Sequence, residues 1–111
     1  MRASSHLLQQ ACRITLFTRE NCGLCTRAKS ALSAVWDSRP FEYREVDIVK
    51  PEARRWRDLY DFDVPVAHIS KTGAPEEDPK LASAAVKLMH RFTPEDVKAK
   101  MDAVEATPLK P

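Results

Sequence analysis

The sequence contains no apolar run as long as a membrane-spanning helix, which needs about 18 residues or more. Its N-terminus also lacks the apolar segment of a secretory signal. Only three cysteines are present, and such a small, odd set does not make the disulfide framework of a small secreted domain. These absences argue against a membrane protein and against an exported one, so we expect a cytoplasmic protein in a reducing compartment.

A strong charge of one sign is also missing. Eighteen basic and sixteen acidic residues give a net charge of +2, far from the concentrated positive charge of nucleic-acid-binding proteins. Apolar residues make up 43% and charged residues 31%, as in ordinary folded domains. The 111 residues have room for one domain, which we place at 13–105 between tails at 1–12 and 106–111. We expect a monomer that binds neither nucleic acid nor membrane.

The first nineteen residues contain no acidic residue. They do contain arginines and serines, namely Arg2, Ser4, Ser5, Arg13 and Arg19. This composition is typical of a mitochondrial presequence. A short tail ahead of the first strand is the simpler interpretation. Mitochondrial localisation therefore stays open as the alternative to the cytoplasm.

The first half of the chain has the pattern of a strand, a helix and a second strand. Residues 13–18 are rich in β-branched and aromatic side chains and predict a buried strand. Apolar residues then recur at helical spacing from Gly23 to Trp36. Alternation over Phe41–Asp47 predicts the next strand. A strand, helix and strand in this order indicate a right-handed parallel crossover, and hence an α/β fold.

The next segment predicts a short helix and a third strand. Pro51 can occupy the first turn of a helix, and apolar residues at helical spacing continue to about Asp61. Residues 66–69 predict a strand, with Pro65 at its head where a missing amide donor is tolerated. Residues 70–85, which include three consecutive acids, are interpreted as a solvated loop.

The last part of the domain is ambiguous until its final helix is considered. Residues 81–92 fit both a helix and a strand. Thr93 and Pro94 have the pattern of an N-cap and a first-turn proline, which opens a helix to about Val104. A strand over 86–92 leads into such a helix, and we choose it.

Cys22 and Cys25 lie between the first predicted strand and the first predicted helix. Two cysteines three apart at a helix start can close a disulfide within one turn, and the free amides there favour an anion. The helix dipole, with Arg19 nearby, is expected to lower the pKa of Cys22. Cys22 would then attack a substrate disulfide, and Cys25 would resolve the mixed disulfide. Gly23 leaves the space beside the reacting sulfur free of a side chain.

The same spacing also makes half of a zinc site. The further candidate ligands are Cys12, His6, His68 and His90, and none of them forms a second pair with metal-site spacing. We therefore favour redox chemistry and expect no metal, with a structural pair of buried thiols as the remaining alternative. Cys12 is interpreted as a small, partly buried residue, the two later histidines as structural, and Trp36 and Trp56 as packing residues.

Residues 16–25, which hold a strand, a basic residue and the dithiol, resemble the glutaredoxin branch of the thioredoxin superfamily. The resemblance returns at Asp63-Val64-Pro65, covers Arg13 to about Val104, and is strongest to the small glutaredoxin-like proteins of eukaryotes. It implies a thioredoxin fold, with a four-stranded mixed sheet flanked by three helices in the order β-α-β-α-β-β-α. It also implies a cis bond before Pro65.

The resemblance further implies residues that contact substrate or glutathione. Arg19 takes the position that contacts a glutathione carboxylate, and Val64 takes the position that pairs with the backbone of the incoming ligand. Asp96 takes a position near the ligand's amino group. Further residues of the implied binding site are Gly23, Leu24 and Pro65. Leu24 stands where glutathione-using members often have tyrosine. The segment 91–93 replaces the glycine pair that precedes the last helix in the family.

Three functions follow as hypotheses. The first is a disulfide reductase that acts on a disulfide-containing protein or a glutathione mixed disulfide, without a covalently bound cofactor and with glutathione as a candidate reductant. The second is a binding module in which Cys22 and glutathione hold an iron-sulfur cluster between two subunits. The third is an interaction protein in which the dithiol is dispensable.

Overall fold

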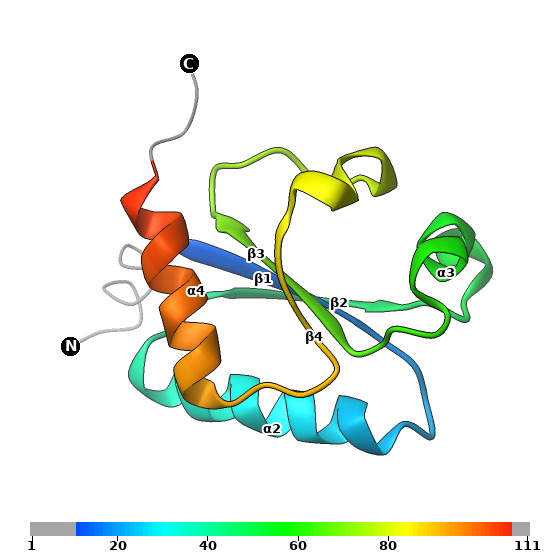
Figure 1. Cartoon of the computed structure of the whole chain (residues 1–111), viewed down its shortest axis with the longest axis horizontal. Helices are drawn as coiled ribbons and strands as arrows, with labels where there is room; N and C mark the ends of the chain where they lie inside the picture. Colours follow the sequence, from blue (N-terminus) through cyan, green and yellow to red (C-terminus); the bar gives the residue numbers. More distant parts are fainter. Residues whose placement is uncertain (1–10, 108–111) are drawn as a thin grey trace.

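A single mixed sheet organises the computed structural model, which describes residues 11–107 (Figure 1). The strand order is β2-β1-β3-β4, and the strands span Cys12–Thr18 (β1), Glu42–Asp47 (β2), Val66–Lys71 (β3) and Val86–Met89 (β4). β1 pairs with β2 in parallel and with β3 antiparallel, and β3 pairs antiparallel with β4. The parallel β1–β2 pair confirms the predicted crossover, and the sheet is mixed as the resemblance implies.

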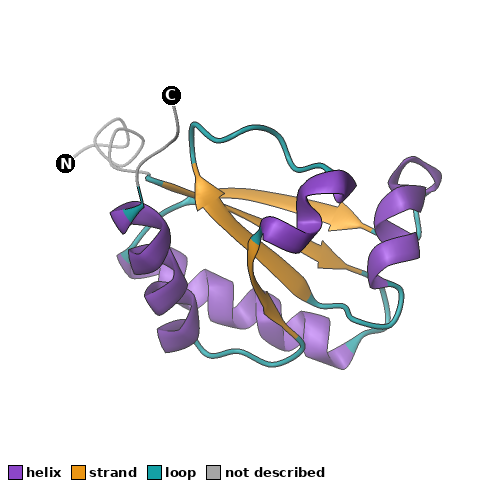
Figure 2. Ribbon diagram, turned by 45° about the horizontal axis from the view of Figure 1, so that its top comes forward, coloured by secondary structure: helices purple, strands orange, loops and turns teal. Residues whose placement is uncertain are grey.

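Figure 2 shows helices on the flanks of the sheet, and three of them are α-helices. They are α2 (Gly23–Ser38), α3 (Arg54–Tyr60) and α4 (Pro94–Ala106). Two short 3₁₀ segments, Pro51–Ala53 and Pro79–Ala84, precede α3 and β4. Within residues 11–107, no helix is both long enough and apolar enough to cross a membrane.

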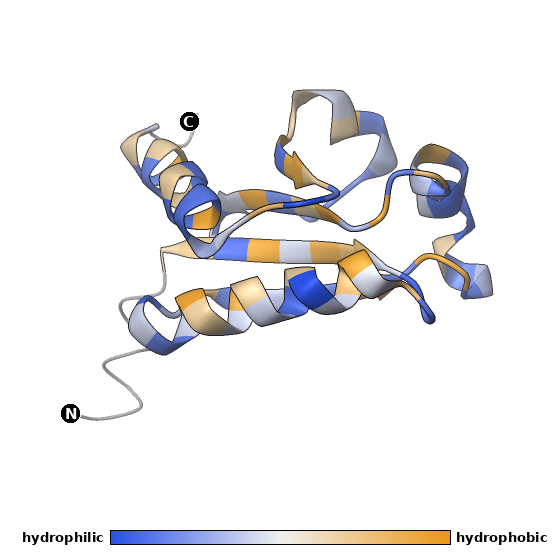
Figure 3. Ribbon diagram, turned by 60° about the horizontal axis from the view of Figure 1, so that its bottom comes forward, coloured by the Kyte–Doolittle hydropathy of each residue, from blue (hydrophilic) through white to orange (hydrophobic). Residues whose placement is uncertain are grey.

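The central strand β1 is buried along its whole length, because strands cover both of its edges and packed elements cover both of its faces. One face forms the larger core, in which Ile14 and Leu16 pack with apolar side chains of α2 and α4. Figure 3 shows these apolar positions of α2 recurring between polar ones. The other face forms a smaller core around Phe17, with Tyr60 of α3 and Ala82 of the second 3₁₀ segment. This second face also receives Arg13 and Thr15, because side chains alternate along a strand.

The N-terminus of α4 forms as the sequence predicts. The Thr93 hydroxyl accepts a hydrogen bond from the Asp96 amide at 3.1 Å, and the Asp96 carboxylate accepts one from the Thr93 amide at 2.9 Å. This capping box satisfies two amide groups that otherwise have no helical partner. Pro94 occupies the first turn, where its missing amide hydrogen costs nothing.

Several predicted boundaries are wrong. The strand expected over 86–92 ends at Met89, because His90 adopts a left-handed φ of 65° and turns the chain. The segment 70–85 is only partly a loop, since β3 continues to Lys71 and residues 79–84 form a 3₁₀ segment. The helix expected from Pro51 begins as a 3₁₀ turn.

Other boundaries move by one or two residues. The first helix ends at Ser38 instead of Trp36, and the second strand begins at Glu42 instead of Phe41. Cys12 belongs to β1, and Ala106 belongs to α4. The ordered elements therefore extend one residue beyond each end of the predicted domain. Most of the two predicted tails, His6 and the first ten residues of the nineteen-residue candidate presequence lie outside the described residues.

Candidate functional site

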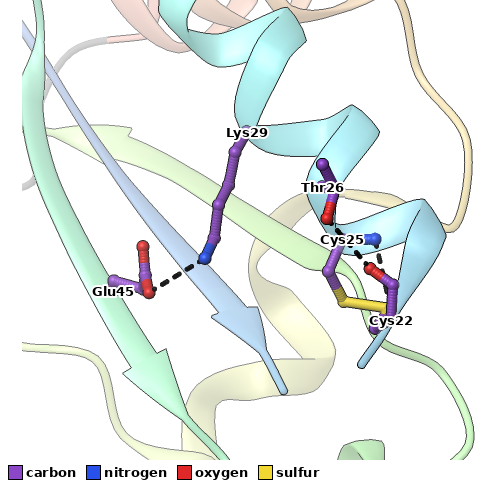
Figure 4. The surroundings of a disulfide bond; sticks show 5 residues. All are labelled: Cys22, Cys25, Thr26, Lys29 and Glu45. Carbon is purple, nitrogen blue, oxygen red and sulfur yellow. Dashed lines mark hydrogen bonds and ion pairs between the residues drawn. A yellow bond between two sulfur atoms is a disulfide. The ribbon is translucent and has the colours of Figure 1, made fainter. Parts of the chain in front are cut away.

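Cys22 and Cys25 form a disulfide at the start of α2, immediately after β1 (Figure 4). Their Cα atoms are 5.2 Å apart, within the range of ordinary disulfides. Cys25 is buried, with 2% of its surface exposed, whereas Cys22 is partly exposed. Cys22 is therefore the more exposed residue of the pair.

Cys22 is the N-cap residue of α2. Its Sγ accepts a hydrogen bond from the Cys25 amide at 3.1 Å, and its carbonyl accepts bonds from the Thr26 amide at 3.1 Å and the Thr26 hydroxyl at 3.3 Å. Figure 4 shows the bonds of the Cys25 amide and the Thr26 hydroxyl beside the sulfur pair. A sulfur at this position lies at the positive end of the helix dipole and accepts a hydrogen bond from a backbone amide. Both interactions stabilise a negative charge on the sulfur.

The chain reaches this position through a tight turn after β1. Asn21 adopts a left-handed φ of 58°, a conformation that asparagine tolerates better than most residues. Gly23 has no positive φ, and a Cβ atom added to it would meet no atom within 4 Å. Neither a positive φ nor a close approach of another segment therefore requires glycine at this position.

Arg19 is engaged within the protein. Its guanidinium forms an ion pair with Asp61, which lies just after α3 and also faces Arg57 at 3.8 Å. Its Nε is buried and has no hydrogen-bond partner among the described residues. Arg19 therefore joins the segment before Cys22 to the loop before Pro65, and Asp61 compensates the positive charge that the sequence places near the dithiol.

The Val64–Pro65 peptide bond is cis, as the resemblance implies. The Pro65 carbonyl accepts a hydrogen bond from the His90 amide at 2.8 Å. The His90 imidazole lies 3.9 Å from the Asp63 carboxylate. Two contacts therefore connect this loop to the end of β4.

A groove of about 240 Å³ lies between the start of α2 and the start of α4. It is lined by Leu24, Arg27, Ala28, His90, Arg91, Phe92, Thr93 and Asp96. The structure thus brings together Leu24 and Asp96, two of the predicted ligand-binding residues, and adds Arg27, His90 and Arg91, which the sequence did not assign to ligand binding. The Asp96 carboxylate is held by the Thr93 amide in the capping box.

The third cysteine, Cys12, is the first residue of β1, whereas the disulfide follows the end of this strand. Cys12 is fully buried in β1, so the expectation of a partly buried residue is wrong. Its thiol lies 3.5 Å from the Glu105 carboxylate and 3.8 Å from the Met101 carbonyl. Burial and then the bond to Glu105 raise the pKa of Cys12 to about 12, which keeps it protonated and unreactive at neutral pH.

Sequence reasoning missed a row of polar side chains buried on the second face of the sheet. Tyr60 Oη lies 2.7 Å from His68 Nε2, His68 Nδ1 lies 2.7 Å from one Glu77 oxygen, and the other Glu77 oxygen lies 3.1 Å from Arg13. We call these four residues the buried polar chain. Glu77 belongs to the acidic run that we expected to be solvated, so that expectation is wrong for this residue. A signal was present, since an arginine in a buried strand needs a carboxylate partner.

The two histidines after Cys25 do not share a site. His68 is buried in the polar chain, whereas His90 is exposed beside Asp63. Trp56 packs on Phe17, with ring centroids 4.3 Å apart, as expected for a packing residue. Trp36 is more exposed, and its indole donates a hydrogen bond to the Phe41 carbonyl. Residues 11–107 contain no group of three or more histidine, cysteine or acidic side chains placed to hold a metal ion.

Comparison with known proteins agrees with this geometry. The family model for the glutaredoxin-like domain (DUF836) matches residues 13–102. The chain belongs to the glutaredoxin-like domain family. The match includes the disulfide, the cis-proline loop and the start of α4, so the family assignment covers every part of the candidate site.

Solved structures place this glutaredoxin-like chain among thioredoxin-fold proteins. A structural-genomics target, XcR50 from X. campestris, is 27% identical and has a TM-score of 0.57, with 81% of this chain and 96% of that chain covered. Thioredoxin O2 from Arabidopsis thaliana, in its oxidised state, is 16% identical and has a TM-score of 0.59, with 92% and 84% covered. Protein Ne2328 from Nitrosomonas europaea is 21% identical, with a TM-score of 0.56 and 81% and 89% covered. The last two likenesses concern the fold alone.

Proposed function

We propose that this protein is a thiol-disulfide oxidoreductase that reduces substrate disulfides through Cys22 and Cys25. The observation that carries the proposal is the Cys22 sulfur itself, which lies at the N-cap of α2, 3.1 Å from the Cys25 amide, with Cys25 buried behind it. Membership of the glutaredoxin-like family and the thioredoxin fold of its structural neighbours support a redox role.

The reaction begins with the reduced dithiol. The Cys22 thiolate attacks one sulfur of a substrate disulfide, a Cys22–substrate disulfide forms, and the first substrate thiolate leaves. Cys25 then loses its proton and attacks the Cys22 sulfur, which releases the second substrate thiolate and forms the Cys22–Cys25 disulfide. Two electrons pass from the protein to the substrate. An external thiol or dithiol reductant returns the protein to its starting state.

Unequal exposure supports different roles for the two cysteines. Only Cys22 is open to a bulky substrate disulfide, whereas the buried Cys25 can reach the sulfur one turn away from it. The helix N-terminus and the Cys25 amide also favour the thiolate form of Cys22. Cys22 is therefore the nucleophile and Cys25 the resolving thiol.

Glutathione is a candidate reductant of the disulfide, and the groove between α2 and α4 is its candidate binding site. Arg27 and Arg91 are exposed cations on its lining that suit a small carboxylate ligand. Arg19 forms an ion pair with Asp61, and the Asp96 carboxylate accepts a hydrogen bond from the Thr93 amide in the capping box of α4. We therefore propose that Arg27 and Arg91, instead of Arg19 and Asp96, provide the contacts to glutathione.

The test compares three single cysteine variants in the reduction of insulin by dithiothreitol and of a glutathione mixed disulfide. Cys22→Ser is expected to abolish both activities. Cys25→Ser retains part of the mixed-disulfide activity, because the first attack needs only Cys22. Cys12→Ala serves as the matched control and keeps both. Failure of the wild-type protein to reduce either substrate would overturn the proposal.

A further inference from the structure

Phe62 is exposed to a degree unusual for an aromatic side chain. It lies in the loop between α3 and the cis-proline, and 93% of its surface is exposed. Leu59, one helical turn earlier, is also exposed. A shallow groove of about 450 Å³ adjoins both residues and is completed by charged side chains of the same segment, Arg54, Arg57, Asp58 and Asp61. We call this area the Phe62 surface.

The backbone that carries Phe62 is held on both sides. Asp61 before it is paired with Arg19 and faces Arg57. The Asp63 amide after it donates to the Tyr60 carbonyl at 2.9 Å, and the Asp63 carboxylate faces His90. Because the backbone around Phe62 is already held, binding through this side chain needs little ordering of the loop, which lowers the cost of association.

The same contacts connect the Phe62 surface to the dithiol. Arg19 lies three residues before Cys22, and its partner Asp61 is the neighbour of Phe62. On the other side, Phe62 lies three residues before Pro65. The Pro65 carbonyl accepts a hydrogen bond from the amide of His90, which lines the groove between the starts of α2 and α4. Phe62 is thus presented from a segment bonded to both flanks of the candidate site.

The charges around Phe62 are already paired within the surface. The surface itself contains two arginines and two aspartates: Arg54 lies 3.4 Å from Asp58, and Arg57 lies 3.8 Å from Asp61. The surface therefore offers an apolar contact without an excess of either charge. A partner with a bulky apolar side chain complements it better than a charged one.

We propose that Phe62 is a specificity-determining anchor for protein substrates, and that it binds a bulky apolar side chain next to the substrate disulfide. This inference rests on the proposed reductase function. Glutathione consists of glutamate, cysteine and glycine and offers no such side chain. The anchor therefore selects disulfides of proteins over disulfides of glutathione.

The test measures kcat/KM of Phe62→Ala for insulin, as a protein disulfide, and for oxidised glutathione, as a disulfide without apolar side chains. The ratio of the two constants is expected to fall about tenfold, mainly through the KM for insulin, as for a truncated interface anchor. Phe62→Leu restores most of the ratio. Leu81→Ala removes an exposed apolar side chain from the 3₁₀ segment, outside the Phe62 surface, and is the matched control.

The outcomes separate the anchor from the reductase chemistry. If the wild-type protein reduces insulin but Phe62→Ala leaves the ratio equal to that of Leu81→Ala, the anchor is refuted and the reductase function stands. A parallel loss on both substrates also refutes it, because the effect then lies in the dithiol. A wild-type protein that reduces neither substrate overturns the proposed function together with the anchor.

Discussion

Removal of the Glu77 side chain tests whether the buried polar chain stabilises the fold. In Glu77→Ala, Arg13 loses its only carboxylate partner among residues 11–107, and His68 loses one of its two bonds. Breaking a buried charge pair from one side costs about 3–5 kcal/mol. Arg13 keeps bonds to the Ala74 and Pro75 carbonyls, at 3.2 and 2.7 Å, and Glu77 is itself 17% exposed. We therefore expect the lower end, about 3 kcal/mol.

Urea unfolding measures this loss as a lower transition midpoint with an unchanged slope. Glu77→Gln keeps the size of the side chain and one acceptor oxygen but removes the charge, so a loss of about 1–2 kcal/mol is expected. Glu76→Ala is the matched control, because the pair that Glu76 forms with Arg44 is exposed, and this change should cost less than about 1 kcal/mol. Equal losses from Glu77→Ala and Glu76→Ala would refute the reasoning.

The same residue predicts a pH dependence. Burial alone would raise the pKa of Glu77, but the bonds and charges of His68 and Arg13 outweigh it and hold the pKa below the ordinary value of 4.5. A carboxylate whose pKa is depressed by folding stabilises the folded state above its unfolded pKa and loses that contribution as the pH falls through the folded pKa. The difference in unfolding free energy between wild type and Glu77→Ala should therefore shrink below pH 4.5. A difference that stays constant in acid would contradict this account.

Two further predictions concern the first strand and the last helix. Burial and the bond to Glu105 raise the pKa of Cys12 to about 12. Cys12 should therefore resist iodoacetamide in the native protein at about pH 8 and react after unfolding in urea. Detection by mass spectrometry of Cys12 labelled in the native protein would contradict its burial. Thr93→Ala should lower the unfolding free energy by about 1 kcal/mol, because the Asp96 amide loses its acceptor, while Thr93→Ser should restore most of it. No difference between these two variants in urea unfolding would show that the cap does not contribute.

Local patterns in the sequence predicted most of the fold. The apolar spacing of α2 and the Thr93–Pro94 start of α4 are determined by residues close together in the chain, and both helices form where expected. The end of β4 could not be predicted in this way. His90 adopts a left-handed φ, which is uncommon for a residue other than glycine. Its amide donates a hydrogen bond to the carbonyl of Pro65, which is distant in the sequence.

In the candidate site, too, the features set by neighbouring residues could be predicted, whereas contacts between distant segments could not. The spacing of Cys22 and Cys25 and their place at a helix start are local features, and the disulfide forms there. The partner of Arg19 is Asp61, in a different element, so its ion pair is a product of tertiary structure. The burial of Glu77 against Arg13 has the same origin, since the loop that carries Glu77 folds back onto the first strand.

The central claim is that Cys22 is the attacking sulfur and Cys25 the resolving one. The most direct measurement reacts the reduced Cys25→Ser and Cys22→Ser variants with oxidised glutathione at neutral pH and follows the mixed disulfide by mass spectrometry. The account predicts rapid glutathionylation of Cys22 in the first variant and little or none of Cys25 in the second, because Cys25 is buried. Equal rates for the two cysteines, or faster reaction of Cys25, would contradict it.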